Sequence, residues 1–135
     1  MIRSAHSLVD QALELLLAHD MIGFAGLWAV DGVMEFPFAP ADRPQRLTGR
    51  AAVEDYVRDY PAQLDVRAIT SQTVYDTTDP AVVIVEFEVA GVVVPTSQPY
   101  QARYIAVITA RDGEISNYRD YWNPQAAAEL MGATA

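Results

Sequence analysis

The hydrophobic pattern of the chain changes once, soon after Pro61, and this change limits the folds that are open to it. Before this point, apart from a short strand-like stretch at 33–38, apolar residues recur every three or four positions, as on one face of a helix. After it they alternate with polar residues, as on the two faces of a strand. The second part is also rich in Val, Ile, Tyr and Thr, which favour strands. Helices followed by strands predict an α+β fold, in which the helices bury their apolar faces against one face of a sheet.

Three helices are predicted in the first part of the chain. Asp20 is expected to cap the second and Thr48 the third, because their side-chain oxygens can accept hydrogen bonds from the free N–H groups of a first helical turn. Asp31-Gly32 is expected to form the turn that ends the second helix, and Pro61 to stop the third. The first helix begins at Ser4 or Ser7 and ends near His19, and the third covers about 49–60.

One strand is predicted before the third helix and four after it. Residues 33–38 have a strand pattern, although Pro37 cannot donate a ladder hydrogen bond and therefore indicates an edge strand or a bulge. Turn residues such as Asp112-Gly113 separate the later strands, so that successive hairpins give a mostly antiparallel meander. The later strands are predicted at 66–76, 81–94, 100–110 and 114–123, and a last short helix from Pro124 to near Met131.

The length of the chain predicts one domain over residues 1–135, with a core that needs no disulfide or metal. A strongly bent sheet would leave a ligand-sized cavity between the helices and the strands. Pro37, Gly91 and Pro95 are the candidate positions for the bulges that bend a sheet.

The composition excludes several classes of function. The net charge is −9, from 18 acidic and 9 basic residues without a basic cluster, so a nucleic-acid partner is not expected. The absence of cysteine is compatible with a cytoplasmic protein. His6 and His19, thirteen positions apart, have no metal-ligand spacing, and no metal site is predicted. Acidic residues interrupt the apolar run 13–18, so that neither a signal peptide nor a membrane span is expected.

The end of the last predicted strand carries a resemblance to a known group of proteins. The segment 118–124 reads Tyr-Arg-Asp-Tyr-Trp-Asn-Pro and follows the turn 111–113. This spacing resembles the phenazine-biosynthesis A/B proteins and the wider SnoaL-like group of the nuclear-transport-factor-2-like superfamily. The order of elements, the pair Asp31-Gly32, the segment 48–50 and the pair Val85-Glu86 extend the resemblance over nearly the whole chain.

The resemblance implies a fold and a range of activities. The fold would be a cone of three or four helices on a curved, mostly antiparallel sheet, paired into homodimers through the outer sheet face. The outward Tyr121 and the valine-rich strand 82–94 are compatible with such a dimer. Proteins of this superfamily include ketosteroid-isomerase-like enzymes, polyketide cyclases, epoxide hydrolases and dehydratases, and also proteins that bind small molecules without converting them.

Asp120 is the first candidate for chemistry. It lies in an otherwise apolar and aromatic strand, at the position where the phenazine proteins carry an acid–base glutamate. Strand alternation places Tyr118, Asp120 and Trp122 on one face. If this face lines the cavity, burial would raise the pKa of the carboxyl towards neutrality, which suits proton transfer. The alternative is a solvated carboxylate paired with Arg103 or Arg119.

Tyr56 and Tyr60 are the next candidates, since residues four apart project from the same side of a helix. They fall where the phenazine proteins place a histidine and a serine. A phenol can donate a hydrogen bond to a carbonyl or enolate oxygen, and Tyr104 offers a further phenol. The alternative is that both helical tyrosines only pack, with their hydroxyls at the rim.

Two activities of the superfamily are not expected here. Glu86 and Glu88 share one strand face, which is either the cavity, where Glu88 would bind the substrate, or the outside. Glu86 stands where the epoxide hydrolases have an arginine, so their mechanism lacks its cation. Phe36 stands where the steroid isomerases have their general base, which disfavours ordinary ketosteroid isomerisation. Trp28 and Trp122 are the aromatic residues expected to line the pocket, although core packing would also explain them.

The leading hypothesis is an acid–base enzyme without cofactor or metal, acting on a hydrophobic carbonyl compound as an isomerase, cyclase or condensation catalyst. Asp120 would move the proton, and Tyr56, Tyr60 or Tyr104 would hold the oxygen. Two alternatives remain open at this point: a protein that binds a small molecule without converting it, and a structural dimer whose cone is filled by its own side chains.

Overall fold

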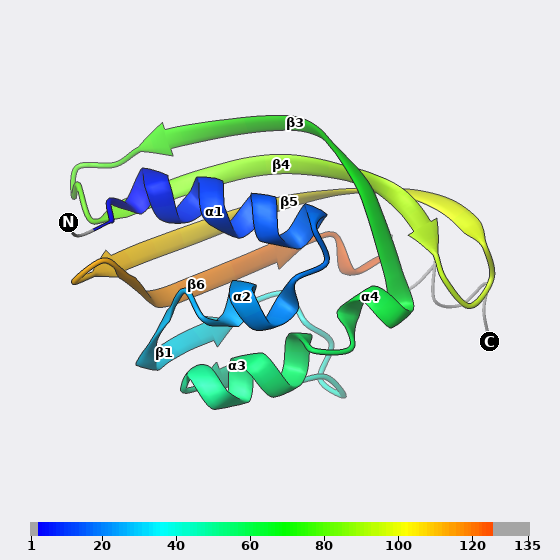
Figure 1. Ribbon diagram of the computed structural model, residues 1–135, viewed down its shortest axis with the longest axis horizontal. Helices are drawn as coiled ribbons and strands as arrows, with labels where there is room; N and C mark the ends of the chain where they lie inside the picture. The colour runs from blue at the N-terminus through cyan, green and yellow to red at the C-terminus, as the bar shows by residue number, and fades with distance from the viewer. Residues whose placement is uncertain (1–2, 126–135) are drawn as a thin grey trace.

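A six-stranded sheet that curves around the N-terminal helix dominates the computed structural model, which describes residues 3–125 (Figure 1). The strand order is β2-β1-β6-β5-β4-β3, and every neighbouring pair is antiparallel except β1 and β6. The α+β class with a curved, mostly antiparallel sheet is therefore confirmed. The helices are α1 (Ala5–Leu17), α2 (Met21–Ala25), α3 (Arg50–Val57) and the single turn α4 (Tyr60–Gln63). The strands are β1 (Trp28–Glu35), β2 (Arg46–Thr48), β3 (Leu64–Asp76), β4 (Val82–Val93), β5 (Gln98–Arg111) and β6 (Glu114–Trp122).

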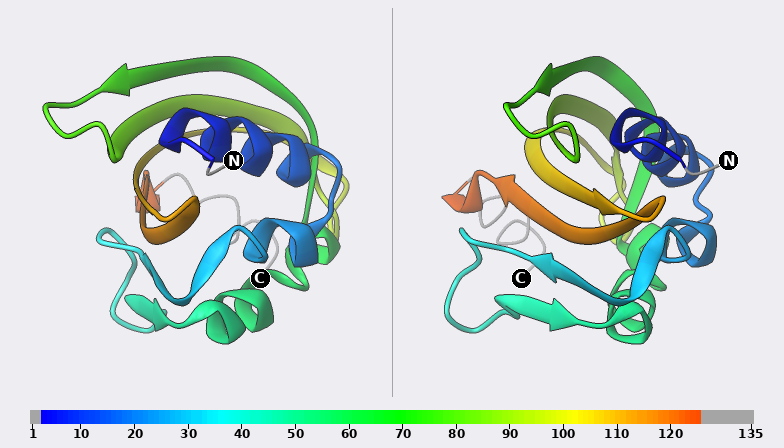
Figure 2. Two further views of the ribbon diagram at one scale, coloured as in Figure 1. Left: turned by 60° about the vertical axis from the view of Figure 1, so that its left-hand side comes forward. Right: turned by 90° about the vertical axis from the view of Figure 1, so that its left-hand side faces the viewer.

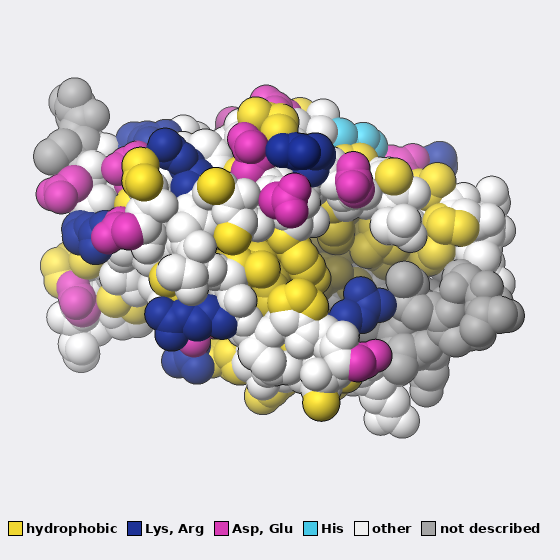
Figure 3. All heavy atoms as spheres, turned by 90° about the horizontal axis from the view of Figure 1, so that it is seen from below, with side chains coloured by type: hydrophobic (Ala, Val, Ile, Leu, Met, Phe, Trp, Pro, Cys, Tyr) yellow, Lys and Arg dark blue, Asp and Glu magenta, His cyan; other side chains and the backbone are white. Residues whose placement is uncertain are grey.

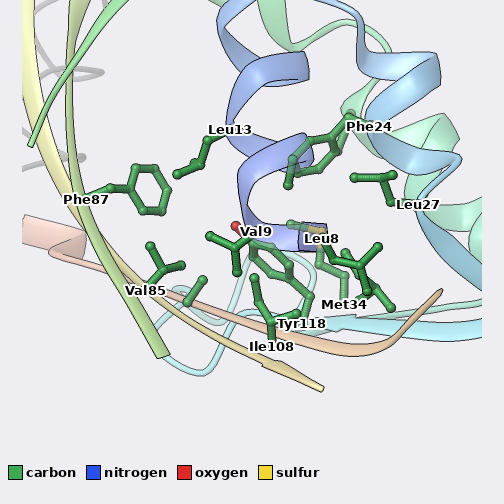
Figure 4. Packing of buried hydrophobic residues seen from close by; sticks show 14 of the residues in the cluster. Leu8, Val9, Leu13, Phe24, Leu27, Met34, Val85, Phe87, Ile108 and Tyr118 are labelled. Carbon is green, nitrogen blue, oxygen red and sulfur yellow. The ribbon is translucent and has the colours of Figure 1, made fainter. Parts of the chain in front are cut away.

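Helix α1 fills the concave side of the sheet. Figure 2 shows β3 and β4 arching over α1, with β1 and α3 on the opposite side of the molecule. Ser4 caps α1, because its side chain accepts a hydrogen bond from the Ser7 N–H, and Leu8 and Val9 are completely buried. Figure 4 shows both residues packed among side chains of the sheet. The core thus lies between α1 and the inner faces of β4, β5 and β6.

The bend of the sheet has a local cause at Gly91. The pairing of β3 with β4 shifts between Val66 and Ala68, opposite this glycine. A Cβ atom built on Gly91 would lie 1.9 Å from the backbone oxygen of Asp65, so that only glycine allows the two strands to approach this closely. One of the three expected bulge positions therefore coincides with an irregularity of the ladder.

Strand β1 begins earlier than predicted. The pair Asp31-Gly32 does not end a helix but lies within β1, where the pairing with β6 shifts between Trp28 and Val33. The indole N–H of Trp28 donates to the Val33 backbone oxygen at 3.4 Å, across this irregularity. The sequence predicts a turn at Asp31-Gly32 because an irregular strand position favours the same small and polar residues as a turn. Asp20 does cap α2, by accepting from the Gly23 N–H.

The third predicted helix is shorter and begins differently. Thr48 does not cap the third helix but belongs to β2, a strand that was not predicted, and Gly49 precedes α3 without a capping side chain. Gly49 has a φ of 94° and donates its N–H to the Gly32 oxygen at 2.8 Å, so β1 fixes the start of the helix. Pro61 does not stop α3, which ends at Val57; it lies in the first turn of α4 instead.

The predicted final helix from Pro124 to near Met131 lies, apart from its first two residues, outside the described part of the chain. Within residues 3–125, no helix has the length and apolar character needed to cross a membrane.

Candidate active site

Asp120 lies on the inner face of β6, inside the cone. Its neighbour across the ladder is Ala106 of β5, which is completely buried and too small to fill the space beside a carboxyl group. Asp120 as a whole is partly exposed to solvent, but its Oδ1 atom is buried and has no hydrogen-bond partner. Burial without a partner penalises the charged form, and it raises the pKa of Asp120 to about 7.

The residues on either side of Asp120 belong to two aromatic clusters. Tyr118 is buried and packs against Trp28, with ring centroids 5.3 Å apart, and it lies among core side chains in Figure 4. Trp122 contacts Phe36, with centroids 5.6 Å apart. The carboxyl therefore lies in largely apolar surroundings, as the raised pKa of Asp120 requires.

Two further phenols lie close to this carboxyl, Tyr60 of α4 and Tyr104 of β5. Burial raises the pKa of Tyr60 well above its usual value, and Tyr104, Tyr100 and Asp120 each raise it further. Burial also raises the pKa of Tyr104, and Asp120 adds to this rise while the Tyr60 hydroxyl opposes it. Both phenols therefore keep their protons at neutral pH and can donate hydrogen bonds.

Tyr56 occupies a different position from Tyr60, although both were expected to line the pocket. Its side chain is 42 % exposed and its ring lies 5.2 Å from that of Phe36, which in turn contacts Trp122. Burial raises the pKa of Tyr56, Arg43 lowers it, and Asp120 raises it. Tyr56 therefore lies between the solvent and the Asp120 site, whereas Tyr60 lies further inside.

Sequence analysis missed Tyr100, which is only 5 % exposed. Its hydroxyl oxygen is buried and has no hydrogen-bond partner. Burial raises the pKa of Tyr100 to about 12, the nearby Tyr60 hydroxyl lowers it, and Asp65 raises it. Although Tyr60 is near enough to act in this way, no hydrogen bond of normal geometry joins the two hydroxyls. The signal was available in the alternation of β5, which places Tyr100 on the same face as Tyr104.

The expectation that Glu88 binds substrate is wrong for this structure. Its side chain lies on the outer sheet face, where it accepts hydrogen bonds from Thr70 at 2.7 Å and Arg103 at 3.3 Å. These partners lower the pKa of Glu88, the hydrogen bond from Thr70 most strongly. The cause is the register of β4, in which Val85, Phe87 and Val89 turn inward and the two glutamates outward.

Trp28 was also expected to line the pocket, but it is part of the core. It has no exposed surface and packs between Phe24 and Tyr118, with centroid distances of 5.1 and 5.3 Å. Its indole N–H is already used by the Val33 oxygen. Trp28 therefore packs against the ring of Tyr118, and core packing accounts for this tryptophan without a ligand.

The described residues also form two clefts that do not contain the Asp120 carboxyl. One, of roughly 260 Å³, lies beside the start of α3. The other, of roughly 430 Å³, lies where the end of β6 meets β5, and both Tyr104 and Trp122 and the outward Ile105 and Tyr121 line it. Figure 3 shows one face of the molecule with a hollow in which hydrophobic side chains gather between charged ones. Within residues 3–125, no group of three or more His, Asp or Glu side chains is placed to hold a metal ion.

Comparison with known proteins places the chain in a family. The model of the SnoaL-like domain matches residues 9–118, which include β1 to β5 and the first part of β6 as far as Tyr118. The chain belongs to the SnoaL-like family. Asp120 lies just beyond the matched range, so the family match does not by itself assign a role to this carboxyl.

Relatives of this SnoaL-like chain include two uncharacterized proteins and one solved structure. It is 44 % identical to YesE of Bacillus subtilis over 122 residues, which are 90 % of this chain and 83 % of YesE. It is 36 % identical to a PhzA/B-like protein of Pseudomonas aeruginosa over 96 % of this chain and 91 % of that protein. A crystal structure of a Bacillus subtilis protein, for which an isomerase activity has been suggested, is 42 % identical, with a TM-score of 0.90 over 95 % of this chain and 92 % of that one.

More distant structures share the fold alone. A Pseudomonas putida protein for which a polyketide cyclase activity has been suggested is 20 % identical, with a TM-score of 0.79 over 93 % of this chain and 96 % of that one. A ketosteroid-isomerase-like protein of Catenulispora acidiphila in complex with trimethylamine has a TM-score of 0.73 at 19 % identity, and a computationally designed 17-OHP binder 0.76 at 20 %. They cover 93 and 92 % of this chain, and 92 and 97 % of their own. Proteins of this fold thus bind small molecules.

Proposed function

We propose that this SnoaL-like protein is an acid–base enzyme that needs no cofactor and moves a proton next to the carbonyl group of a hydrophobic small molecule. One observation carries the proposal: a buried, unpartnered carboxyl with a pKa of about 7 lies among protonated phenols. A general base with a pKa near the working pH combines a useful ionised fraction with a strong affinity for the proton.

In the proposed reaction, the Asp120 carboxylate removes a proton from the carbon next to the carbonyl. The electrons of the broken C–H bond form a C–C double bond, and those of the carbonyl move to its oxygen, giving an enolate and a neutral Asp120. Tyr104 and Tyr60, both buried, donate hydrogen bonds to the enolate oxygen and stabilise its charge as it develops. We prefer them to Tyr56, because the exposed ring of Tyr56 suits the entrance.

The enolate has two outcomes, both without a further reactant. If Asp120 returns the proton to a different carbon of a conjugated substrate, the product is an isomer. If instead the enolate carbon attacks a second carbonyl of the same molecule, a C–C bond forms, the second oxygen takes the proton from Asp120, and the product is a ring. The isomerase and cyclase activities suggested for the structural neighbours are compatible with one first step.

The test measures that first step directly. A panel of aryl and alicyclic ketones in D₂O is incubated with the protein, and deuterium in the position next to the carbonyl is followed by NMR. We expect exchange above the buffer rate, and a loss of about 100-fold or more in Asp120→Asn. Asp10→Asn removes an exposed carboxylate from α1 and should exchange normally. Equal exchange by the wild type and Asp120→Asn would refute the proposal.

A second candidate is a protein that binds a small molecule and leaves it unchanged. The observation that favours it is the same pair of buried unpartnered atoms, since a ligand can satisfy them without any reaction. Saturable binding of a ketone with no deuterium exchange would decide for this candidate. The purely structural alternative would be supported if no ketone of the panel bound.

We also propose that two copies pair through the outer sheet face. Exposed apolar side chains lie there, including Ile105 at 40 % and Tyr75 at 49 %, and Phe38 packs edge-on against Tyr121. Ile105 and Tyr121 of this face also line the larger cleft. Sedimentation of the wild type should give a dimer at micromolar concentration and that of Ile105→Glu a monomer; a monomeric wild type would contradict the pairing.

A further inference from the structure

Tyr100 offers a second polar group at some distance from Asp120. It lies near the start of β5, opposite Gly91 of β4, and its hydroxyl is buried without a hydrogen-bond partner. Leaving a hydroxyl in this state costs about 1–3 kcal/mol, so a phenylalanine would serve the fold better. Packing thus accounts for the ring of Tyr100 but not for its oxygen.

The hydroxyl lies at one end of a row of phenols, and Asp120 lies at the other. Tyr100 is four residues from Tyr104 on the same strand face, which corresponds to about 13 Å between their Cα atoms. Asp120 lies opposite Ala106, two residues further along β5. Asp120 and Tyr100 both raise the pKa values of Tyr60 and Tyr104, so these two phenols lie between them.

The charges around this row restrict what can bind along it. Besides burial, the groups that shift the pKa values of Tyr60, Tyr100 and Tyr104 are these phenols themselves and the carboxyls of Asp120 and Asp65. No cation of the described chain is among them. An anionic ligand would therefore meet no opposite charge. The Tyr100 phenol keeps its proton, so it donates to a neutral oxygen.

We propose that the substrate is an elongated, neutral, hydrophobic molecule with two oxygen functions, and that the second one accepts a hydrogen bond from Tyr100. This inference rests on the proposed function, which places the reacting carbonyl beside Asp120 and the hydroxyls of Tyr60 and Tyr104. The second function is an ether, hydroxyl or carbonyl oxygen at the far end of the molecule. Tyr100 is then a binding residue that sets the orientation in which the substrate meets Asp120.

Two matched probes test the second contact. 2-Acetyl-6-methoxynaphthalene carries an ether oxygen at the end opposite its ketone, and 2-acetyl-6-ethylnaphthalene has a CH₂ group in its place. We expect the wild type to bind the methoxy probe about two- to tenfold more tightly, as one net hydrogen bond gives. In Tyr100→Phe this preference should disappear. Tyr75→Phe deletes an exposed hydroxyl on the outer face and should keep the preference.

The free protein provides a separate readout. Because the Tyr100 hydroxyl is unpartnered, Tyr100→Phe should unfold at the same or a higher urea concentration than the wild type, which also shows that the variant is folded. An unchanged probe preference in Tyr100→Phe, no preference in the wild type, or failure of both probes to bind at millimolar concentration would each overturn the inference. Deuterium exchange in Asp120→Asn judges the proposed function separately, since Tyr100 takes no part in that step.

Discussion

The burial of Asp120 predicts that this carboxyl destabilises the folded protein at high pH. In the unfolded chain it ionises with its ordinary pKa of 3.8, whereas in the folded protein the pKa is about 7. Below pH 3.8 both states hold the proton and nothing is lost. As the pH rises towards 7 the unfolded state ionises first, so the free energy of unfolding falls, and above pH 7 the loss is complete.

The two pKa values also give the size of the effect. Their difference corresponds to about 4 kcal/mol when the folded carboxyl is fully ionised, of which about 2.5 kcal/mol develops between pH 5 and pH 8. Asp120→Asn has a similar shape and cannot ionise. Its free energy of unfolding, minus that of the wild type, should therefore increase by about 2.5 kcal/mol over this range.

Urea unfolding at several pH values, followed by tryptophan fluorescence, measures this difference. Asp10→Asn is the control, because it removes one negative charge from an exposed site and so reports the effect of net charge alone. If the stability difference between Asp120→Asn and the wild type is the same at pH 5 and pH 8, the carboxyl ionises as in solvent. The argument from burial, and the proposed base with it, would then be wrong.

Three further outcomes are expected. The rate of deuterium exchange by the wild type should rise about tenfold per pH unit below pH 7 and level off above about pH 8, as Asp120 becomes ionised; a flat profile would exclude it as the base. Tyr104→Phe should lose about 100-fold in exchange rate and Tyr56→Phe less than tenfold, and the reverse order would assign the oxygen to Tyr56. Gly91→Ala should cost about 3 kcal/mol in urea unfolding, because its methyl group would meet the Asp65 oxygen, and an unchanged midpoint would show that the strands can separate there.

Sequence analysis predicted well where one residue determines its local structure. The N-cap at Asp20 was found because a carboxylate can satisfy free N–H groups within the same turn. The predicted cap at Thr48 was wrong. Its hydroxyl could cap a helix, but Thr48 pairs with Val33 of β1 and so belongs to a strand. A local propensity, which reflects about four neighbouring residues, does not predict strand pairing with a segment fifteen positions away.

For the site, too, the sequence predicted local features but not those that depend on the whole fold. Strand alternation correctly grouped Tyr118, Asp120 and Trp122, since the period of two is a property of the single strand. Alternation cannot say which face is the inner one, so the sequence left Glu88 either in the pocket or on the outside. It also leaves open how deep a side chain lies along the cone, which is what separates Tyr56 at the surface from the buried Tyr100.

Glu88 and Asp120 together show how the face of a strand determines the chemistry of a carboxyl group. Both lie in long strands of the same sheet, and each has an aromatic residue next to it in sequence. On the outer face, Thr70 and Arg103 satisfy Glu88 and lower its pKa, so it stays charged and inert. On the inner face Asp120 has no such partner, and its proton is held until neutral pH. Exchanging the two environments, for example by placing an arginine at Ala106 beside Asp120, should lower the pKa of that carboxyl and stop exchange while leaving the acid in place.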